Sequence, residues 1–432
     1  MNLFSILENS SWPWAGDAAV VHGTCRLSYS ELFGAARRFA SKLCSAGVES
    51  GDKVGLFCPN SPAYVIASLA ILHREAILVT APPGLQAGDV FNLTEQMKLD
   101  AIITSDSLRT LVPDGYGRSA SEVALTGQGE GLHIFCARAR MTPVSERRAL
   151  EALHAATVRF SSGTLSEAKG IVVSHATYLA RLNGYDSALP PFKEDKILWL
   201  QPIATVLEGL YIYLLRGATI VLGHAVDAAH LTRLVAEHGI TQVYAPPLFY
   251  RMMLNEKNIA PGDLAGIRYF MSTGSALPGG VGQAFHERFG REIVECYGLA
   301  ECGRVLVNFV EAAHKRGSVG KPALGYEVTL MPHPAVPHAQ DRGELCVRGP
   351  GLFDAYYKPW RLRESVLEGG WFKTGDLARR DEDGTYWITG RIKEVINVGG
   401  LKVFPAEIEA LLLRHPEVDE ALVYGVPDAR FG

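Results

Sequence analysis

Segments with helical spacing alternate with short apolar runs along most of the chain, and this alternation constrains the fold most strongly. The start of one predicted helix is marked by a capping box, Ser28-Tyr29-Ser30-Glu31, whose hydroxyl and carboxylate satisfy backbone donors at a helix start. Strands that alternate with helices favour parallel sheets covered by those helices, so we predict an α/β fold. The predicted helix and strand pairs are Leu32 to Leu43 with Val54 to Cys58, Ala63 to Leu72 with Ala76 to Thr80, and Ala229 to His238 with Thr241 to Tyr244.

The pattern changes near Gly343. Glu344 to Gly349 and Gly384 to Ile388 are short strand-like runs bounded by Gly and Asp-Gly turns, which indicates antiparallel or barrel-like structure. The last part changes again, with a helix predicted over Ala406 to Arg414 and a strand over Glu420 to Tyr424. Three different patterns of secondary structure in a chain of 432 residues predict more than one packed unit.

Composition narrows the possible partners. The chain is 47% hydrophobic and 20% charged with a net charge of -4, so it lacks the basic footprint of a protein that binds nucleic acid or an anionic membrane. Its most apolar stretch, Ala63 to Leu72, is shorter than the about 20 residues that span a bilayer. The seven cysteines include no CxxC pair, and no secretory signal precedes them, so we expect reduced thiols in a cytoplasmic protein.

The first of three polar clusters is the loop Phe160 to Gly170, which lies between two strand-like runs. Its hydroxyls, glycines and Lys169 suit the binding of a polyphosphate. Five residues separate Gly163 from Lys169, and no Ser or Thr follows the lysine, so the loop is not a Walker A loop. By itself this loop is more typical of a solvated turn.

The second cluster joins Met271 to Pro278 with Glu295 to Glu301. Tyr297 beside Gly298 offers a flat face to a purine, and Glu301 offers a carboxylate to Mg²⁺. The plainer alternative is that Tyr297 is a core aromatic residue and Glu301 a surface acid.

The third cluster pairs Asp376, in Trp371 to Leu377, with Arg391. One carboxylate and one guanidinium can hold a ribose diol between them. The alternative is that Asp376 opens a turn and Arg391 pairs with Glu394 at the surface.

The ordered combination of these clusters resembles the adenylate-forming superfamily, which comprises acyl-CoA synthetases, nonribosomal adenylation domains and luciferases. The resemblance runs from about Ser28 to the last residue. The matching residues are Ser162, Gly163, Thr164, Lys169 and Gly170 in the phosphate loop, Tyr297, Gly298 and Glu301 in the Tyr-Gly-x-Thr-Glu motif, Asp376 in Thr-Gly-Asp, Arg391 and Lys393 in the hinge motif, and Gly399-Gly400 with Pro405 to Glu409 beyond it.

The resemblance implies a large domain over residues 1–390 and the start of a small α+β domain over 391–432. Within the large domain, two parallel-type α/β subdomains would occupy about 1–340 and a small β-barrel-like subdomain about 341–390. Only 42 residues remain from Arg391 onward, whereas the family's small domain has on the order of 100 to 120 residues and carries a lysine used in adenylation. Because Lys402 is the only lysine after Lys393, we expect a truncated form or gene fragment that adenylates weakly.

The family attaches AMP to a carboxylic acid with release of pyrophosphate, and Mg²⁺, lysine and loop donors offset the repulsion between the two anions. By resemblance, Lys169, Thr164, Glu301 and Lys393 are the catalytic residues, with Glu301 holding Mg²⁺ and Lys393 at the hinge. The ATP-binding residues implied are Ser161, Ser162, Gly163, Thr164, Ser166, Lys169, Gly274, Ser275, Ala276, Glu295, Cys296, Tyr297, Gly298, Asp376, Ile388 and Arg391.

The resemblance also implies an acyl pocket and an acceptor channel. Apolar pocket residues indicate a hydrophobic acid of modest size, with Glu208 either a polar handle or, more simply, a paired or rim acid. Coenzyme A is the expected acceptor, and it would reach the acyl group past Gly399 and Gly400. An amino acid or the thiol of a carrier protein is the alternative acceptor. A further alternative is that the protein is an inactive nucleotide-binding homologue. The acyl-pocket residues implied are Thr205, Val206, Leu207, Ala245, Phe249, Met271 and Thr273.

Overall fold

The computed structural model divides the chain into two compact units. Unit 1 comprises Met1–Asp186, Pro190–His224 and Phe353–Ser365, and unit 2 comprises Ser187–Leu189, Ala225–Leu352 and Val366–Gly432. The structure describes residues 2–80, 84, 86–123, 131–160, 169–188, 191–223, 227–278, 280–308, 315–336, 341–399, 401–413, 415, 418 and 421–428.

Unit 1 contains a nine-stranded sheet with a parallel centre. Its order is β20-β19-β9-β8-β4-β3-β5-β7-β6, in which β3 pairs in parallel with β4 and β5, and β4 with β8. The outer pairs are antiparallel. The strands are β3 (Lys53–Phe57), β4 (Ile77–Thr80), β5 (Ala101–Ser105), β6 (Tyr116–Val123), β7 (Leu132–Ala137), β8 (Ala155–Arg159), β9 (Ile171–Ser174), β19 (Ala355–Tyr356) and β20 (Arg361–Leu362).

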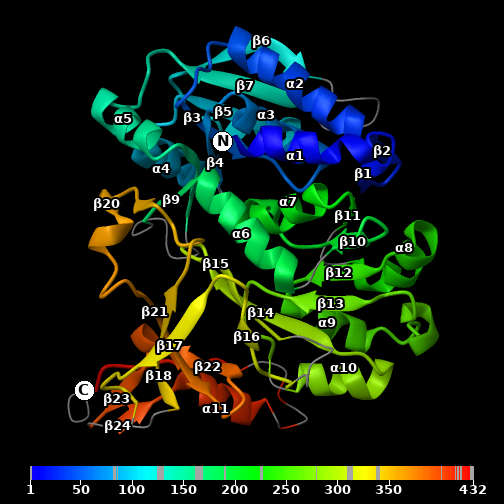
Figure 1. Cartoon of the computed structure of the whole chain (residues 1–432), viewed down its shortest axis with the longest axis vertical. Coiled ribbons are helices and arrows are strands. Elements are labelled where there is room, and N and C mark those ends of the chain that lie inside the picture. Colours follow the sequence, from blue (N-terminus) through cyan, green and yellow to red (C-terminus); the bar gives the residue numbers. More distant parts are fainter. Residues whose placement is uncertain are drawn as a thin grey trace. The chain divides into compact units, whose positions relative to one another are not determined.

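A second group of strands in unit 1 lies in the order β10-β11-β1-β2. Its strands are β1 (Ala18–His22), β2 (Cys25–Ser28), β10 (Lys196–Trp199) and β11 (Thr219–Leu222), and all its pairs are parallel except β1 with β2. The helices of this unit are α1 (Leu3–Ser11), α2 (Tyr29–Ser45), α3 (Pro62–His73), α4 (Ala87–Met97), α5 (Val144–Ala152), α6 (His175–Ala188) and α7 (Leu207–Leu215), with short 3-10 turns such as η3 (Ile203–Thr205) (Figure 1).

The helices predicted over Leu32 to Leu43 and Ala63 to Leu72 are present as α2 and α3, and the predicted capping box at Ser28 is confirmed. The hydroxyl of Ser28 accepts from the backbone N–H of Glu31 at 3.2 Å, and the Glu31 carboxylate accepts from the backbone N–H of Ser28 at 2.8 Å. The chain leaves this helix through Gly47, whose φ of 93° lies in the left-handed region. Helix α3 is apolar on every side because it is buried all round, and it packs against α2.

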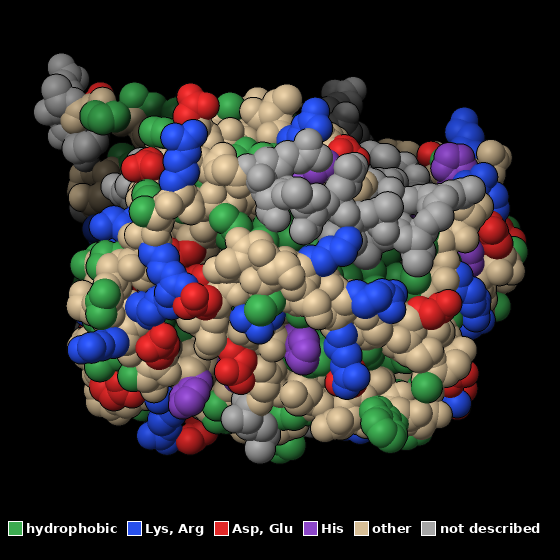
Figure 2. Space-filling view, turned by 90° about the horizontal axis from the view of Figure 1, so that it is seen from above, with side chains coloured by type: hydrophobic (Ala, Val, Ile, Leu, Met, Phe, Trp, Pro, Cys, Tyr) green, Lys and Arg blue, Asp and Glu red, His purple; other side chains and the backbone are tan. Residues whose placement is uncertain are grey.

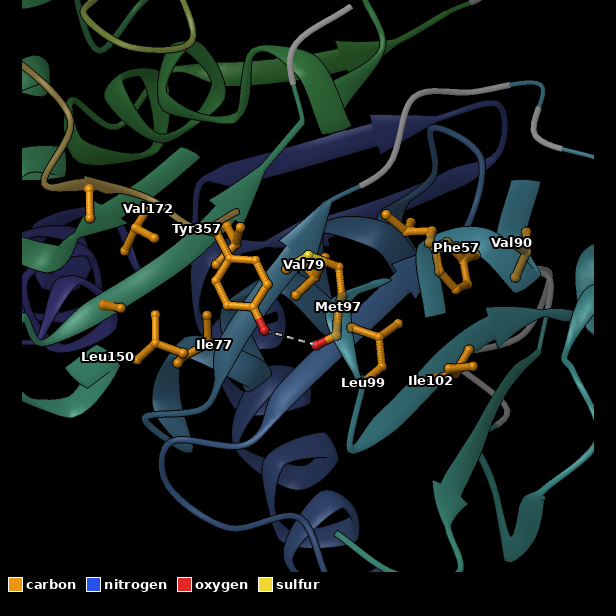
Figure 3. Close-up of a cluster of buried hydrophobic side chains, with 14 of the residues drawn as sticks. Phe57, Ile77, Val79, Val90, Met97, Leu99, Ile102, Leu150, Val172 and Tyr357 are labelled. Carbon is orange, nitrogen blue, oxygen red and sulfur yellow. Dashed lines mark hydrogen bonds between the residues drawn. The ribbon is translucent and has the colours of Figure 1, made fainter. Parts of the chain in front are cut away.

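The core of unit 1 joins residues that are far apart in the sequence. Tyr357, which follows β19, packs among Ile77, Val79 and Leu99, and its hydroxyl donates to the carbonyl oxygen of Met97 at 3.2 Å (Figure 3). The buried Lys53 ammonium contacts both the Tyr357 hydroxyl and the Glu146 carboxylate. The Phe353–Ser365 segment is therefore fixed to the rest of unit 1 by both apolar packing and a paired buried charge.

Unit 2 contains a parallel set of strands followed by antiparallel ones. Strands β12 (Gln242–Ala245), β13 (Tyr269–Ser272) and β14 (Ile293–Leu299) pair in parallel, and β15 (Gly303–Val307) and β16 (Lys321–Pro322) continue the sheet in the antiparallel sense. Its helices include α8 (Leu231–His238), α9 (Pro247–Asn255) and α10 (Val281–Phe289) (Figure 1). These two units confirm the predicted α/β class.

The antiparallel part of unit 2 is a four-stranded sheet in the order β17-β18-β21-β22. Its strands are β17 (Glu327–Met331), β18 (Arg342–Arg348), β21 (Phe372–Arg380) and β22 (Tyr386–Arg391). It is followed by η7 (Ile392–Glu394), the hairpin β23 (Ile396–Val398) with β24 (Leu401–Val403), and α11 (Pro405–Leu412). The division into residues 1–390 and 391–432 stays a prediction.

The strand predicted over Glu420 to Tyr424 is wrong for its described residues. Residues 421–428 have no regular secondary structure, and Leu422 and Tyr424 are exposed. The backbone N–H of Val423 donates to the Glu409 carboxylate of α11 at 2.8 Å instead of to a strand. Apolar residues favour a strand only where a neighbouring strand accepts their backbone hydrogen bonds.

No helix in the described part of the chain is long and apolar enough to cross a membrane. Figure 2 shows basic and acidic side chains interspersed over the described part of one face.

Replacement of Ser28 by alanine should loosen the start of α2. The change removes the side-chain acceptor of the Glu31 N–H and lowers the stability of the helix by about 1 kcal/mol. We therefore expect amide hydrogen exchange in the first turn to become roughly fivefold faster. Ser41→Ala is the matched control, because Ser41 is an exposed serine within the same helix. Equal exchange in the two variants would contradict the capping role.

Candidate active site

The structure brings together Tyr297, Asp376 and Arg391, all in unit 2. Tyr297 lies near the end of β14, and its hydroxyl donates to Oδ2 of Asp376 at 2.6 Å. Asp376 and Arg391 face each other in the β21–β22 register, and Nε of Arg391 lies 3.0 Å from Oδ1 of Asp376. The structure thus brings the two predicted ribose-binding residues into contact with each other, and Arg391 forms this ion pair with Asp376. Their role toward a ribose stays a prediction.

The backbone around Asp376 explains why Thr and Gly precede it. The Thr374 hydroxyl donates to the carbonyl oxygen of Leu345 at 2.8 Å and accepts from the N–H of Asp376 at 3.1 Å. Gly375 has a φ of +77°, which a side chain rarely tolerates, and its N–H donates to the Glu344 carboxylate at 3.2 Å. The Thr-Gly-Asp sequence therefore forms an irregularity in β21, and this irregularity places Asp376 within hydrogen-bond distance of Tyr297.

Burial governs the ionisation of this cluster. The Asp376 side chain is only 4% exposed, and burial raises the pKa of its carboxyl group although Tyr297 and Arg391 act against that rise. Burial, followed by the negative charge of Asp376, raises the pKa of Tyr297 well above its usual range, so the phenol stays a hydrogen-bond donor. A carboxylate has about four acceptor positions, and these two bonds use two of them. Asp376 therefore retains the capacity to accept from a diol.

Gly298 and Glu301 belong to the β14–β15 hairpin. A Cβ at Gly298 would lie 2.2 Å from the carbonyl oxygen of Gly303, so this position excludes every residue with a side chain. Glu301 is half-buried in the turn that joins the two strands. No group of three or more His, Cys, Asp or Glu in the described part of the chain is arranged to hold a metal. A single carboxylate fits Mg²⁺ only when substrate phosphates complete its coordination.

Glu295 and Cys296 precede Tyr297 on β14. Glu295 is buried and accepts from the N–H of Gly317 at 3.1 Å, and burial raises the pKa of its carboxyl group to about 7. Burial also raises the pKa of the Cys296 thiol. Both residues therefore favour their neutral forms more than an exposed residue of the same type would.

The remaining nucleotide-site candidates are dispersed. Lys169 is exposed, with its ammonium 5.2 Å from the ring centre of Tyr356, a residue of the same unit. Gly274 follows β13 with a φ of +95° and begins an exposed run through Ser275 and Ala276. Ile388 is half-buried in β22, and Lys393 is exposed in η7. Ser161, Ser162, Gly163, Thr164 and Ser166 lie outside the described residues.

The predicted acyl-pocket residues fall in both units, with Thr205, Val206 and Leu207 in unit 1 and the others in unit 2. Within unit 2, the ring of Phe249 packs edge to face on Tyr250, whose hydroxyl donates to the carbonyl oxygen of Met271 at 2.7 Å. Leu207, Ala245, Phe249 and Met271 are buried, Val206 and Thr273 half-buried, and Thr205 exposed. Of the acceptor candidates, Gly399 is exposed, and Gly400 lies outside the described residues.

Sequence analysis did not identify Arg159 and Arg181 as partners of Glu208. The three side chains form a buried charged cluster in unit 1, so Glu208 is a paired acid, the simpler of the two interpretations. A charged residue at the end of the apolar run of β8 was the available signal for Arg159. Nothing in the spacing of Arg181 indicated its partner.

The pKa of Glu295 predicts how stability depends on pH. Its carboxyl group holds a proton in the folded state up to about pH 7 but releases it near pH 4.5 when unfolded, so its contribution to stability falls as the pH rises from 4.5 to 7. Glu295→Gln removes that loss. The variant should become more stable relative to the parent by on the order of 3 kcal/mol over this range. Melting temperatures of both proteins from pH 5 to 8 test this, and a constant difference would contradict it.

Comparison with known proteins identifies the family of this chain. The model of the family described as AMP-binding enzyme matches residues 8–357. An oxalate–CoA ligase of Arabidopsis thaliana is 27% identical over 446 residues, which cover 100% of this chain and 87% of the relative. A feruloyl-CoA synthase of an Amycolatopsis species is 27% identical over 423 residues, which cover 96% of this chain and 83% of the relative.

Solved structures agree in fold. ATP-bound MatB of Rhodopseudomonas palustris superposes with a TM-score of 0.83 at 22% identity, covering 100% of this chain and 87% of that one. The O-succinylbenzoate CoA synthetase of Bacillus subtilis in complex with AMP gives a TM-score of 0.81 at 23% identity, covering 100% of this chain and 87% of that one. The family model, which matches residues 8–357, shows that the chain belongs to the AMP-binding enzyme family of adenylate-forming ligases.

Proposed function

We propose that this protein is an ATP-dependent ligase that converts a hydrophobic carboxylic acid to its acyl-adenylate, with release of pyrophosphate, and transfers the acyl group to coenzyme A. The observation that carries the proposal is the cluster of Tyr297, Asp376 and Arg391. A nearly buried carboxylate that keeps acceptor capacity beside a guanidinium is suited to a ribose diol.

Coenzyme A is the proposed acceptor because the relatives share it. The two relatives described above are an oxalate–CoA ligase and a feruloyl-CoA synthase, so they differ in the acid but share coenzyme A. All seven cysteines are free thiols in the structure, which supports our proposal that the enzyme works in the reducing cytoplasm.

The proposed mechanism assigns binding and charge compensation to this chain. The Asp376 carboxylate would accept from the ribose hydroxyls, Arg391 would keep that carboxylate ionised, and the ring of Tyr297 would contact the base. Lys169 and the hydroxyls of residues 161–166 would donate to the phosphates. When bound, Mg²⁺ neutralises charge on the phosphates, and Glu301 is the side chain that would hold it. Lys169 and the loop hydroxyls would also reduce the repulsion between the carboxylate of the acid and the phosphates as the carboxylate approaches the α-phosphorus.

The acid is proposed to be hydrophobic because the acyl candidates of unit 2 lie in an apolar, aromatic environment. Ala245, Phe249 and Met271 are buried, and α9 is fixed to β13 through Tyr250. Such surroundings favour an apolar body over a second charged group.

Release of pyrophosphate, measured over a panel of aromatic, cyclic and linear carboxylic acids, tests the proposal. We expect release that depends on one class of acid, followed by a product whose mass equals the acyl-CoA when coenzyme A is added. Parallel reactions with amino acids and with a carrier protein identify a different acceptor. No release with any acid would contradict the ligase proposal and favour an inactive nucleotide-binding homologue.

Asp376→Asn should raise the KM for ATP by about 10- to 100-fold. The amide keeps the shape of the side chain but loses the charge that strengthens hydrogen bonds from the ribose hydroxyls and Arg391, and bonds to charged groups contribute about 1.5–3 kcal/mol. The matched control is Asp383→Asn, because Asp383 is an exposed acid that pairs with Lys315 in the same unit. A rise of equal size in both variants would contradict the assignment.

A further inference from the structure

A buried charged cluster in unit 1 is not used by the proposed chemistry. Glu208, in the first turn of α7, receives bonds from Nη1 of Arg159 at 2.7 Å and 2.6 Å, one to each carboxylate oxygen. Nη1 of Arg181 lies 3.4 Å from the same carboxylate. The side chains of Arg159, Arg181 and Glu208 are 6%, 0% and 4% exposed. Two cations and one anion are therefore held away from water.

Arg159 makes a second contact that reaches the backbone. Its Nη2 donates to the carbonyl oxygen of Thr205, at the end of η3. Arg159 is also the last residue of β8 and directly precedes the predicted phosphate loop, Phe160 to Gly170. One guanidinium thus joins the strand that leads into the predicted phosphate loop to the segment that carries the predicted acyl residues Thr205, Val206 and Leu207.

The same segment is fixed at its other end by Asn60. The Asn60 amide donates to the carbonyl oxygen of Gln201 at 2.7 Å and accepts from the N–H of Ile203 at 2.9 Å. Residues 201–208 are therefore held at one end by Asn60, which lies between β3 and α3, and at the other by Arg159, the last residue of β8. We call residues 201–208 the clamped segment.

Stability alone gives no reason for a cluster of this kind. Burial of three charges carries a desolvation cost that apolar side chains of similar volume would avoid. A guanidinium nevertheless offers several donors in a fixed planar geometry, so it can bind a carboxylate and a carbonyl oxygen together and define their separation. An apolar residue cannot set the position of Thr205 in this way.

We infer that Arg159 and Glu208 are positioning residues for the acid substrate: together they hold the clamped segment in the place from which it contacts the acyl group. The inference rests on the proposed ligase function. Neither residue needs to touch the acid, since both act through the backbone and side chains of residues 205–207. A shift of about 1 Å in such a segment is enough to weaken substrate placement strongly.

The inference predicts a selective effect on the acid. Arg159→Lys keeps one positive charge, but an ammonium on a flexible stem cannot bond to Glu208 and the Thr205 carbonyl in the same geometry. We expect the KM for the acid to rise at least tenfold, the KM for ATP to change less than twofold, and the fold to be retained. A role in stability alone would not separate the two KM values.

The matched control is Arg147→Lys. Arg147 also joins a carboxylate, that of Asp52, to a backbone carbonyl, that of Ser50, and it lies in unit 1 on α5. It makes no contact with the clamped segment in the described structure, so both KM values should stay within twofold of the parent.

A second variant and a double variant complete the test, which measures acid-dependent pyrophosphate release for every protein. Glu208→Gln should also raise the KM for the acid. The KM of the double variant Arg159→Lys/Glu208→Gln should not exceed the higher of the two single-variant values, because both residues act on one segment.

If Glu208→Gln does not fold, the result for Arg159→Lys decides alone. An unchanged KM for the acid in Arg159→Lys, or equal rises for acid and ATP, would overturn this inference. Absence of acid-dependent release by the parent would overturn the ligase proposal and this inference with it.

Discussion

The candidate site depends on one nearly buried carboxylate. Asp376 is withdrawn from water, yet it is kept polar by the Tyr297 hydroxyl and the Arg391 guanidinium. An unpaired carboxylate in that place would be costly, and a fully saturated one would have no capacity left for a ligand. The local structure of unit 2 serves this balance: Gly375 and Thr374 shape the irregularity before Asp376, and the β21–β22 register places Arg391 opposite it.

Unit 1 shows a related use of buried charge. Lys53 with Glu146 and Tyr357 fixes the Phe353–Ser365 segment to the core, and Arg159 with Glu208 fixes the clamped segment. In each case a long cationic side chain connects segments that are far apart in the sequence. Apolar packing can hold such segments together, but directional bonds to a guanidinium or ammonium also define where each one lies.

Much of the fold followed from local sequence signals. The capping box of α2, the apolar period of its buried face and the short apolar strands are determined by nearby residues, and the structure has them where they were predicted. The predicted strand over Glu420 to Tyr424 failed because a strand depends on a partner that local sequence does not reveal.

The candidate site, like the fold, could be predicted only in part from the sequence. Resemblance of motifs was sufficient to name Tyr297, Asp376 and Arg391, but it did not indicate that the Tyr297 hydroxyl bonds directly to Asp376. Arg159, Arg181 and Glu208 could not be paired from the sequence, because they come from three elements that only the tertiary fold brings together. Residues that position others carry no motif of their own, so they are found from contacts.

A crystal structure of the protein with a non-hydrolysable ATP analogue tests whether Asp376 holds the ribose. We expect the ribose hydroxyls to lie within hydrogen-bond distance of the Asp376 carboxylate, about 2.6–3.2 Å, while Arg391 keeps its ion pair with Asp376. A nucleotide bound away from Asp376, with the ribose contacting neither Asp376 nor Arg391, would contradict it.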